Sequence, residues 1–176
     1  MSSLKNEADF VILLNENQNL VHKICRMYTD SKAAHDDLFQ EISIQLWRSY
    51  DRFEGKSKFS TWMYRVGLNT AITLYRKEKK RIDSGVLQDN IPQIAVEEYD
   101  SEIDEQLAWL YKKINAFSEI DKALILLYLE DKKYDEIAET LGISSVNARV
   151  KMNRIKKRLK EMINDRHDGW IEIIKK

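Results

Sequence analysis

The chain has 176 residues, of which 43% are hydrophobic, and its 29 basic and 29 acidic side chains give a net charge of zero. This length suits one ordinary domain or two small ones, and the hydrophobic content excludes a chain that is disordered throughout. The composition includes one proline and five glycines, which disfavours a turn-rich β fold and favours helices with short connections.

Cys25 is the one cysteine of the sequence, so neither an intramolecular disulfide nor a thiolate zinc site can form. We interpret it as a small buried apolar residue. No apolar run approaches the ~18 residues that a membrane-spanning helix needs, and residues 1–10 lack the apolar core of a signal peptide. We therefore expect a cytoplasmic protein with no direct membrane insertion.

Three helices are expected in the first half of the chain. Apolar residues recur at steps of three and four over residues 10–24, 34–50 and 60–80, as they do along one face of an amphipathic helix. A short polar loop, residues 51–59, separates the second and third of these helices. The candidate N-caps of the third helix are Ser60 and Thr61.

The charges are distributed unevenly along the chain. Residues 1–81 carry 14 Lys/Arg against 10 Asp/Glu, and residues 106–176 carry 15 against 11. Residues 82–105 carry eight acids and no Lys or Arg, and they include the one proline, Pro92. This pattern predicts an N-terminal domain over 1–81, a flexible acidic linker over 82–105 and a C-terminal domain over 106–176, the last with a tail.

The second half of the chain predicts a helix-turn-helix. A helix over residues 106–116 is followed by Ser118 as the N-cap of an apolar helix. A short amphipathic helix over residues 134–141 then ends at Gly142, and Ser144 caps a long helix to about residue 163. A short helix, a turn that contains glycine and a second helix suit insertion of that second helix into a DNA groove. The predicted fold is all-α.

The long last helix is strongly basic. It has no acid between Ser144 and Lys160, so it can neutralise several phosphates and bind DNA with a salt-dependent affinity. A solvated charged face is the alternative, but the position after the glycine turn favours DNA contact. The cations are Arg149, Lys151, Arg154, Lys156, Lys157, Arg158 and Lys160.

Helical geometry assigns the two faces of this helix. At about 100° per residue, one narrow apolar stripe must face the core; it consists of Ala148, Met152, Ile155 and Leu159. The opposite face and its flanks are predicted to contact DNA. The candidate DNA-binding residues of this helix are Ser145, Val146, Asn147, Arg149, Val150, Lys151, Asn153, Arg154 and Lys157.

Two long segments resemble a known family. The run from Ala34 to Arg81 resembles the promoter −10 domain of sigma factors, and the run from Phe117 to Lys160 resembles their −35 domain, including its Tyr-Asp-Glu-Ile-Ala and Leu-Gly-Ile-Ser motifs. No segment corresponds to the intermediate domain of housekeeping members, so the chain is similar to the extracytoplasmic-function branch of the sigma-70 family. The matching features of the first run are Asp36, Asp37, Gln40, Glu41, Trp47, Phe53, Trp62 to Arg65, Asn69 to Ala71 and Arg76 to Arg81.

The resemblance implies an alternative sigma factor, which binds core RNA polymerase and directs transcription initiation at −10/−35 promoters. It implies that the loop from Phe53 to Phe59 and Asn69 form the site for a flipped −10 base, whose exposed Watson–Crick edge an amide can recognise. The alternative for Asn69 is an amide on the helix surface without this role. Trp47 is expected to lie in the core, on the same apolar stripe as Leu46, rather than to contact the polymerase. Phe59 and Trp62 are expected to be structural rather than to stack on a base. The implied −10 residues are Lys56, Lys58, Phe59, Arg65, Asn69 and Arg76. The implied residues for docking on core polymerase are Asp37, Gln40, Glu41 and Leu46.

One position departs from the family pattern. Housekeeping sigma factors have two adjacent tryptophans that help to open the duplex, whereas Trp62 is followed by Met63 in this chain. This difference leaves open which residues melt the DNA. The acidic linker is either a solvated spacer or a segment that threads the positively lined RNA channel of the polymerase. An anti-sigma factor is a further candidate partner.

Two other functions are the alternatives to this one. A helix-turn-helix regulator that acts outside the polymerase would not bind the core enzyme. A nuclease or nucleotide-modifying enzyme would need a phosphate-binding loop or metal ligands, but the three histidines, His22, His35 and His167, are scattered without ligand spacing. We therefore expect no catalytic residues, no cofactor and no metal site.

Overall fold

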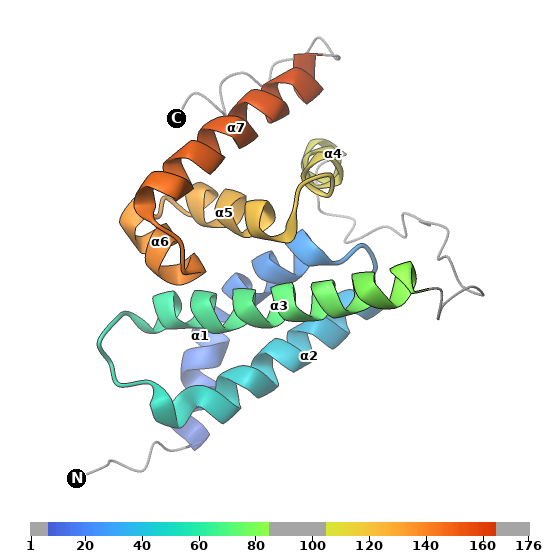
Figure 1. The fold of residues 1–176 in the computed structure, drawn as a ribbon. Coiled ribbons are helices and arrows are strands. Elements are labelled where there is room, and N and C mark those ends of the chain that lie inside the picture. Colours follow the sequence, from blue (N-terminus) through green and yellow to red (C-terminus); the bar gives the residue numbers. More distant parts are fainter. Residues whose placement is uncertain (1–6, 85–104, 165–176) are drawn as a thin grey trace. The chain divides into compact units, whose positions relative to one another are not determined.

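The computed structural model describes residues 7–84 and 105–164, and the regular structure in these two ranges is entirely helical (Figure 1). The predicted all-α class is confirmed. The chain divides into two compact units, Met1–Ile103 and Asp104–Lys176. Of the predicted acidic linker, residues 85–104 lie outside the described residues, as does the tail over residues 165–176.

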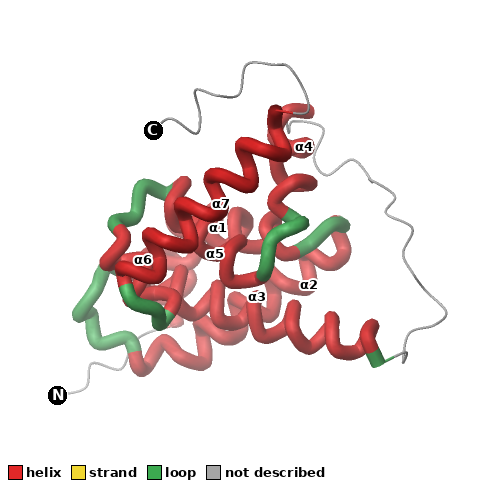
Figure 2. The backbone as a smooth tube through the Cα atoms, turned by 45° about the horizontal axis from the view of Figure 1, so that its top comes forward, coloured by secondary structure: helices red, strands yellow, loops and turns green. Residues whose placement is uncertain are grey.

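Over residues 7–84, the N-terminal unit is built from three helices and a short 3-10 turn, whose arrangement is drawn in Figures 1 and 2. Each of the three helices packs against the other two. The helices are α1 (Glu7–Tyr28), α2 (Lys32–Ser49) and α3 (Phe59–Asp83), and the 3-10 turn η1 covers Tyr50–Arg52. The centre of the unit consists of side chains that are at most 1% exposed, among them Val21, Ile24, Ile42, Leu46, Met63 and Leu68.

A side-chain hydrogen bond caps the N-terminus of α2 but not that of α3. Ser31 has an extended backbone, and its Oγ accepts a hydrogen bond from the Ala34 amide at 3.2 Å, which begins α2. The expected cap of α3 at Ser60 or Thr61 is wrong, because α3 begins one residue earlier and Lys58 occupies the N-cap position without a side-chain hydrogen bond. Helix α3 also runs two residues into the predicted linker, to Asp83.

Gly67 lies where α3 passes close to α1. A Cβ atom at this position would be 2.7 Å from Cδ1 of Ile24, a residue of α1 with no exposed surface. The missing side chain therefore allows the two helices to approach, which accounts for a glycine in the middle of a helix that it would otherwise weaken. Cys25, on the next position of α1, is fully buried as predicted, and burial raises the pKa of its thiol to about 12.

Within residues 105–164, the C-terminal unit has four helices, of which α5 packs against both α6 and α7. They are α4 (Glu105–Ile114), α5 (Glu119–Leu129), α6 (Tyr134–Leu141) and α7 (Ser145–Asn164). The predicted cap at Ser118 is confirmed, since its Oγ accepts a hydrogen bond from the Asp121 amide at 3.2 Å. Leu124, Leu127 and Ile137 are at most 1% exposed and form part of the core.

A tight turn joins α6 to α7 and completes the predicted helix-turn-helix. Gly142 has a φ of 66°, in the left-handed region that favours glycine, and it ends α6. The Ile143 amide donates to the Ala138 carbonyl at 3.1 Å, and Ser144 Oγ accepts from the Asn147 amide at 3.1 Å. These hydrogen bonds satisfy backbone groups at the end of α6 and at the start of α7. Among residues 7–84 and 105–164, no helix has the length and apolar character needed to cross a bilayer.

Candidate nucleic-acid and protein interfaces

Helix α7 has a buried face and an exposed face, as its sequence predicts. The four residues of the predicted apolar stripe, Ala148, Met152, Ile155 and Leu159, are at most 8% exposed. On the opposite side, Val146 is 70% exposed and Val150 is 42% exposed. Helix α7 therefore presents a solvent-facing surface that is available to bind a partner.

The basic side chains of α7 do not all point outward, however. Lys151 Nζ lies 3.4 Å from Asp121 Oδ1, and the Lys151 side chain is 33% exposed. Lys156 Nζ lies 4.2 Å from the ring centroid of Tyr128 and donates to its hydroxyl at 2.5 Å. These two lysines fasten α7 to α5 through an ion pair and a cation–π contact.

Arg158 adds a third contact of this kind. Its guanidinium carbon lies 4.8 Å from the ring centroid of Phe117, and Nη2 donates to the Ala116 carbonyl at 3.4 Å. Lys151, Lys156 and Arg158 together, here called the anchoring cations, hold α7 against α5 and the residues just before it. Arg158 is exposed all the same, whereas Lys151 and Lys156 are half-buried. The sequence alone placed all three on a basic helix face and did not indicate that two of them are partly withdrawn from solvent.

The remaining predicted DNA-binding side chains of α7 are arranged around the two valines. Arg149 extends over the Tyr134 ring of α6, with its guanidinium carbon 5.5 Å from the ring centroid. Ser145, in the first turn, is half-buried. The exposed members of the set are Val146, Asn147, Arg149, Val150, Asn153, Arg154 and Lys157.

A second exposed polar face runs along α3. Arg65, Asn69 and Arg76 are exposed, and their spacings of four and seven residues place them on the same side of the helix. Lys58 precedes this face and Lys56 lies in the loop before it, where it forms an ion pair with Glu54. The structure thus aligns three of the predicted −10 residues on one helix.

Aromatic rings pack together at the start of this face. The Phe59 ring centroid lies 5.3 Å from that of Trp62 and 5.5 Å from that of Phe53. Tyr50 adjoins the same group, 6.3 Å from Phe59 and 6.5 Å from Trp62. The prediction that Phe59 and Trp62 are mainly structural agrees with these contacts. Both are half-buried, so part of each ring remains accessible.

The face of α2 that was expected to meet a protein partner needs one correction. Asp37 and Gln40 are exposed, and Glu41 is half-buried and accepts a hydrogen bond from Gln45 Nε2 at 2.8 Å. Leu46, however, has no exposed surface, so it cannot contact a partner directly, and its predicted role in docking is wrong. It belongs to the core of the unit.

Two apolar residues lie on this side of α2, of which the sequence reasoning missed Ile44 and assigned Trp47 to the core. Ile44 is 44% exposed and Trp47 is 45% exposed, although Trp47 was expected to be mainly core. The Trp47 ring does pack on Phe10 of α1, with centroids 5.1 Å apart. Ile44 could have been found, because it lies seven residues after Asp37 and hence on the same helix face.

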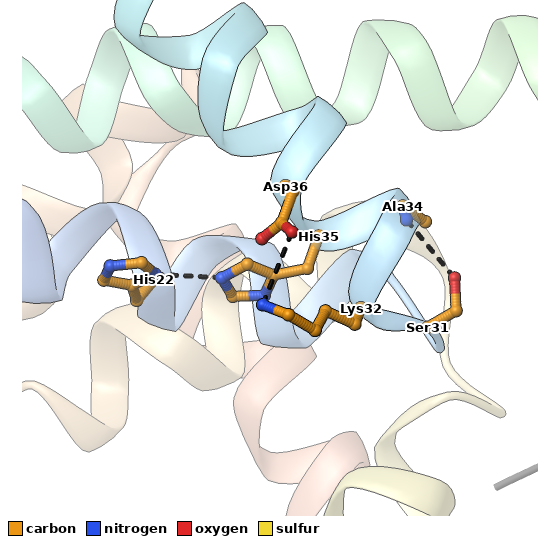
Figure 3. A network of polar contacts seen from close by, with 6 residues as sticks. All are labelled: His22, Ser31, Lys32, Ala34, His35 and Asp36. Atoms are coloured by element: carbon orange, nitrogen blue, oxygen red, sulfur yellow. Dashed lines mark hydrogen bonds and ion pairs between the residues drawn. The ribbon is translucent and has the colours of Figure 1, made fainter. Parts of the chain in front are cut away.

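The structure also brings two histidines together, which the sequence did not indicate (Figure 3). His22 Nδ1 lies 2.9 Å from His35 Nε2. The His22 ring also stacks on Phe39, with centroids 4.6 Å apart. Burial, and then the neighbouring His22, lower the pKa of His35 to about 4. The pKa of His22 is also lowered, mainly by burial and secondly by the positive charge of Arg26.

Among the described residues, this pair does not belong to a larger group of candidate metal ligands. In the parts of the chain that the structure describes, no group of three or more His, Cys, Asp or Glu side chains is arranged to hold a metal ion. Asp36, beside the pair, forms an ion pair with Lys32 at 3.4 Å (Figure 3). His167 lies outside the described residues.

Comparison with known proteins places these two units in one family. Residues 13–81 match the model of sigma-70 region 2, and residues 107–159 match a model of sigma-70 region 4. The chain is 30% identical to the ECF RNA polymerase sigma factor SigM of Bacillus subtilis over 152 residues, which are 83% of this chain and 90% of SigM. It is 27% identical over 154 residues to the ECF RNA polymerase sigma-E factor of Haemophilus influenzae, covering 80% of this chain and 81% of the relative.

Solved structures agree on the fold. The sigma factor RpoE of Bartonella quintana, crystallised with the anti-sigma factor NepR, matches with a TM-score of 0.69 at 20% identity, covering 89% of this chain and 97% of RpoE. CnrH in complex with the cytosolic domain of CnrY matches with a TM-score of 0.67 at 18% identity, covering 92% of this chain and 91% of CnrH.

The two matched regions and the helical fold define a transcription initiation factor of the sigma-70 type. Within that class, the chain belongs to the extracytoplasmic-function (ECF) family of RNA polymerase sigma factors. Its function is to bind core RNA polymerase and to direct transcription initiation at promoters. The family consists of initiation factors rather than of catalytic enzymes.

Proposed function

We propose that the two domains divide promoter recognition between them. Residues 1–81 bind core polymerase and the −10 element, and residues 106–176 read the −35 element through α7 in the major groove. The observation that carries this proposal is the two-faced character of α7, whose buried stripe lies opposite exposed polar, basic and valine side chains. A helix so exposed after a tight turn suits insertion into a major groove.

The −10 element is assigned to the exposed face of α3. The Asn69 amide carries both a donor and an acceptor, which suits the Watson–Crick edge of an unpaired base. Arg65 and Arg76 lie along the same face and are suited to binding phosphates, together with Lys56 and Lys58. Phe59 contributes the accessible part of its ring, on which a base can stack.

The docking surface for core polymerase is assigned to the exposed side of α2. Asp37, Gln40 and Glu41 supply negative and polar groups that steer association with a basic partner. Ile44 and Trp47, each nearly half exposed, supply the apolar contacts that usually provide most of the binding energy at the centre of an interface.

The proposal includes the setting in which these surfaces act. The chain works in the cytoplasm, where the polymerase is, and it has no catalytic residues and no cofactor. The acidic linker, residues 82–105, follows the RNA channel of the polymerase or spans the two domains as a solvated spacer. An anti-sigma factor is proposed as a further partner, because RpoE and CnrH, which share the fold, were solved in complex with NepR and with the cytosolic domain of CnrY.

Reconstituted transcription tests the proposal. Purified chain and core polymerase are incubated with a library of genomic fragments, and the 5′ ends of the transcripts are sequenced. We expect start sites that share one −35 and one −10 motif and that depend on the added chain.

The double variant Asp37→Lys/Glu41→Lys should lose core binding in a pull-down while its circular dichroism spectrum is unchanged. Undiminished core binding by the double variant would remove this face of α2 from the interface.

A further inference from the structure

The exposed centre of α7 is apolar in its first two turns. Val146 and Val150 are 70% and 42% exposed, whereas the aliphatic residues of the buried stripe on the same helix are at most 8% exposed. Single exposed valines are common on protein surfaces. Two on adjacent turns of a helix, both pointing away from the core, form a small apolar strip in an otherwise polar surface.

The neighbouring charges lie beside this strip or beyond it. Arg149, on one flank, extends toward the Tyr134 ring, and Lys151, on the other flank, is paired with Asp121. Arg154 comes one turn after Val150 and is exposed. The first turns of a recognition helix are those that reach base edges. The side chains at the centre of those turns are therefore the valines.

A valine can recognise only one feature of the major groove. The groove presents hydrogen-bond donors and acceptors from all four bases, and its one apolar group is the C5-methyl of thymine. Against guanine or adenine, a valine would cover acceptors without offering them a donor, which is unfavourable. Against thymine, it removes two apolar surfaces from water.

We infer that Val146 and Val150 are specificity-determining residues that read thymine methyl groups in the −35 element. The inference rests on the proposed insertion of α7 into the major groove. Four residues of helix rise by about 6 Å, and successive bases of one strand are about 3.4 Å apart. The two valines thus span about two base steps, and the thymines they contact are separated by one base pair.

The test removes the methyl group and nothing else. Each thymine of a −35 element mapped with the holoenzyme is replaced in turn by uracil, and the affinity of the holoenzyme for the duplex is measured. We expect a loss of roughly two- to tenfold at the contacted positions, the effect of burying about one or two methyl-sized groups. Replacing the contacted thymine–adenine pair by cytosine–guanine should weaken binding. Replacing that cytosine by 5-methylcytosine restores the methyl group and should recover part of the affinity.

A double-mutant comparison then assigns the contact to one side chain. The Val150→Ser variant should lose about the same factor on thymine DNA and show almost no further loss on the uracil duplex. Leu129→Ser is the matched control: Leu129 is 50% exposed in α5, outside the proposed DNA face, so its substitution should not change the affinity. Thermal melting checks that both variants are folded.

The outcomes separate this inference from the proposed function. If the losses from Val150→Ser and from uracil multiply at every thymine, Val150 does not touch a methyl group and the inference is overturned. The same follows if Val150→Ser leaves promoter affinity unchanged while Arg154→Gln weakens it, although α7 then still binds DNA. If neither substitution affects the promoter complex, the proposed role of α7 fails as well.

Discussion

His22 Nδ1 and His35 Nε2 face each other at 2.9 Å and join α1 to α2 (Figure 3). At this distance one ring must donate a proton and the other must accept it, so at least one imidazole is neutral. His35 is 7% exposed. The contact is therefore a buried link between two helices that requires a neutral ring.

The first prediction is that acid weakens the N-terminal unit through this pair. The pKa of His35 is lowered from 6.5 to about 4 and that of His22 is also lowered, so the unfolded chain binds more protons between these values. The contribution of this pair to the free energy of unfolding is complete above about pH 6.5 and is lost as the pH falls toward 4. We expect a loss of about 1–2 kcal/mol between pH 7 and pH 5, measured by urea unfolding. The variant His35→Gln keeps a hydrogen-bonding group that does not titrate, and a pH slope as steep as that of the wild type would count against this origin.

The second prediction concerns the close approach at Gly67. An alanine there would place Cβ 2.7 Å from Ile24 Cδ1, inside a packed core, so Gly67→Ala should destabilise the unit by about 1–3 kcal/mol. The variant Ile24→Val removes that Cδ1 atom. In the Ile24→Val background, Gly67→Ala should cost clearly less, as urea unfolding of the four proteins would show. Stabilisation of the wild type by Gly67→Ala, which helix propensity alone would give, would contradict the contact.

The third prediction contrasts two residues of α2 that lie two positions apart. Leu46→Ala should lower the free energy of unfolding by about 2–5 kcal/mol, because Leu46 has no exposed surface. Ile44→Ser should change it little, because Ile44 is 44% exposed, but it should weaken the affinity for core polymerase. Unfolding and a core-binding titration are run on both variants. Polymerase binding that survives Ile44→Ser intact would remove Ile44 from the interface.

The fourth prediction uses the Lys151–Asp121 ion pair, whose atoms are 3.4 Å apart. Arg154 is exposed, so Arg154→Gln should reduce the slope of log affinity against log salt for promoter DNA by about one. Lys151→Gln should reduce it less, since its ammonium is already paired. Asp121→Asn releases Lys151 and should steepen the slope. Equal effects of Arg154→Gln and Lys151→Gln would show that the pair opens on DNA.

The sequence predicts the features of this fold that repeat along a single helix. The stripe of α7 and the caps at Ser118 and Ser144 follow from spacing and from local hydrogen bonding, and the structure confirms each. The assignment of Trp47 was wrong because hydrophobicity placed it on the stripe of Leu46, one position away. One position is about 100° of rotation, which turns Trp47 toward the edge of the unit.

Contacts between helices could not be predicted in this way. His22 and His35 are 13 residues apart and lie on different helices, and Lys151 and Asp121 are 30 residues apart. How two helices cross decides whether such residues meet, and periodicity within one helix carries no information about the crossing. For the same reason, the sequence could not show which cations of α7 contact other parts of the unit.

In α7, the residues that attach the helix to its unit are different from those that face outward. This separation affects how the DNA sequence preference of such a protein can change. Lys151, Lys156 and Arg158 are held by Asp121, Tyr128 and Phe117, and these contacts, with the buried stripe, fix the helix in its own unit. The outward positions contribute little to that attachment, so they can be exchanged at small cost in folding stability. A new promoter preference is then within reach of a few surface substitutions, and a library that varies only those positions would yield folded chains with altered target sequences.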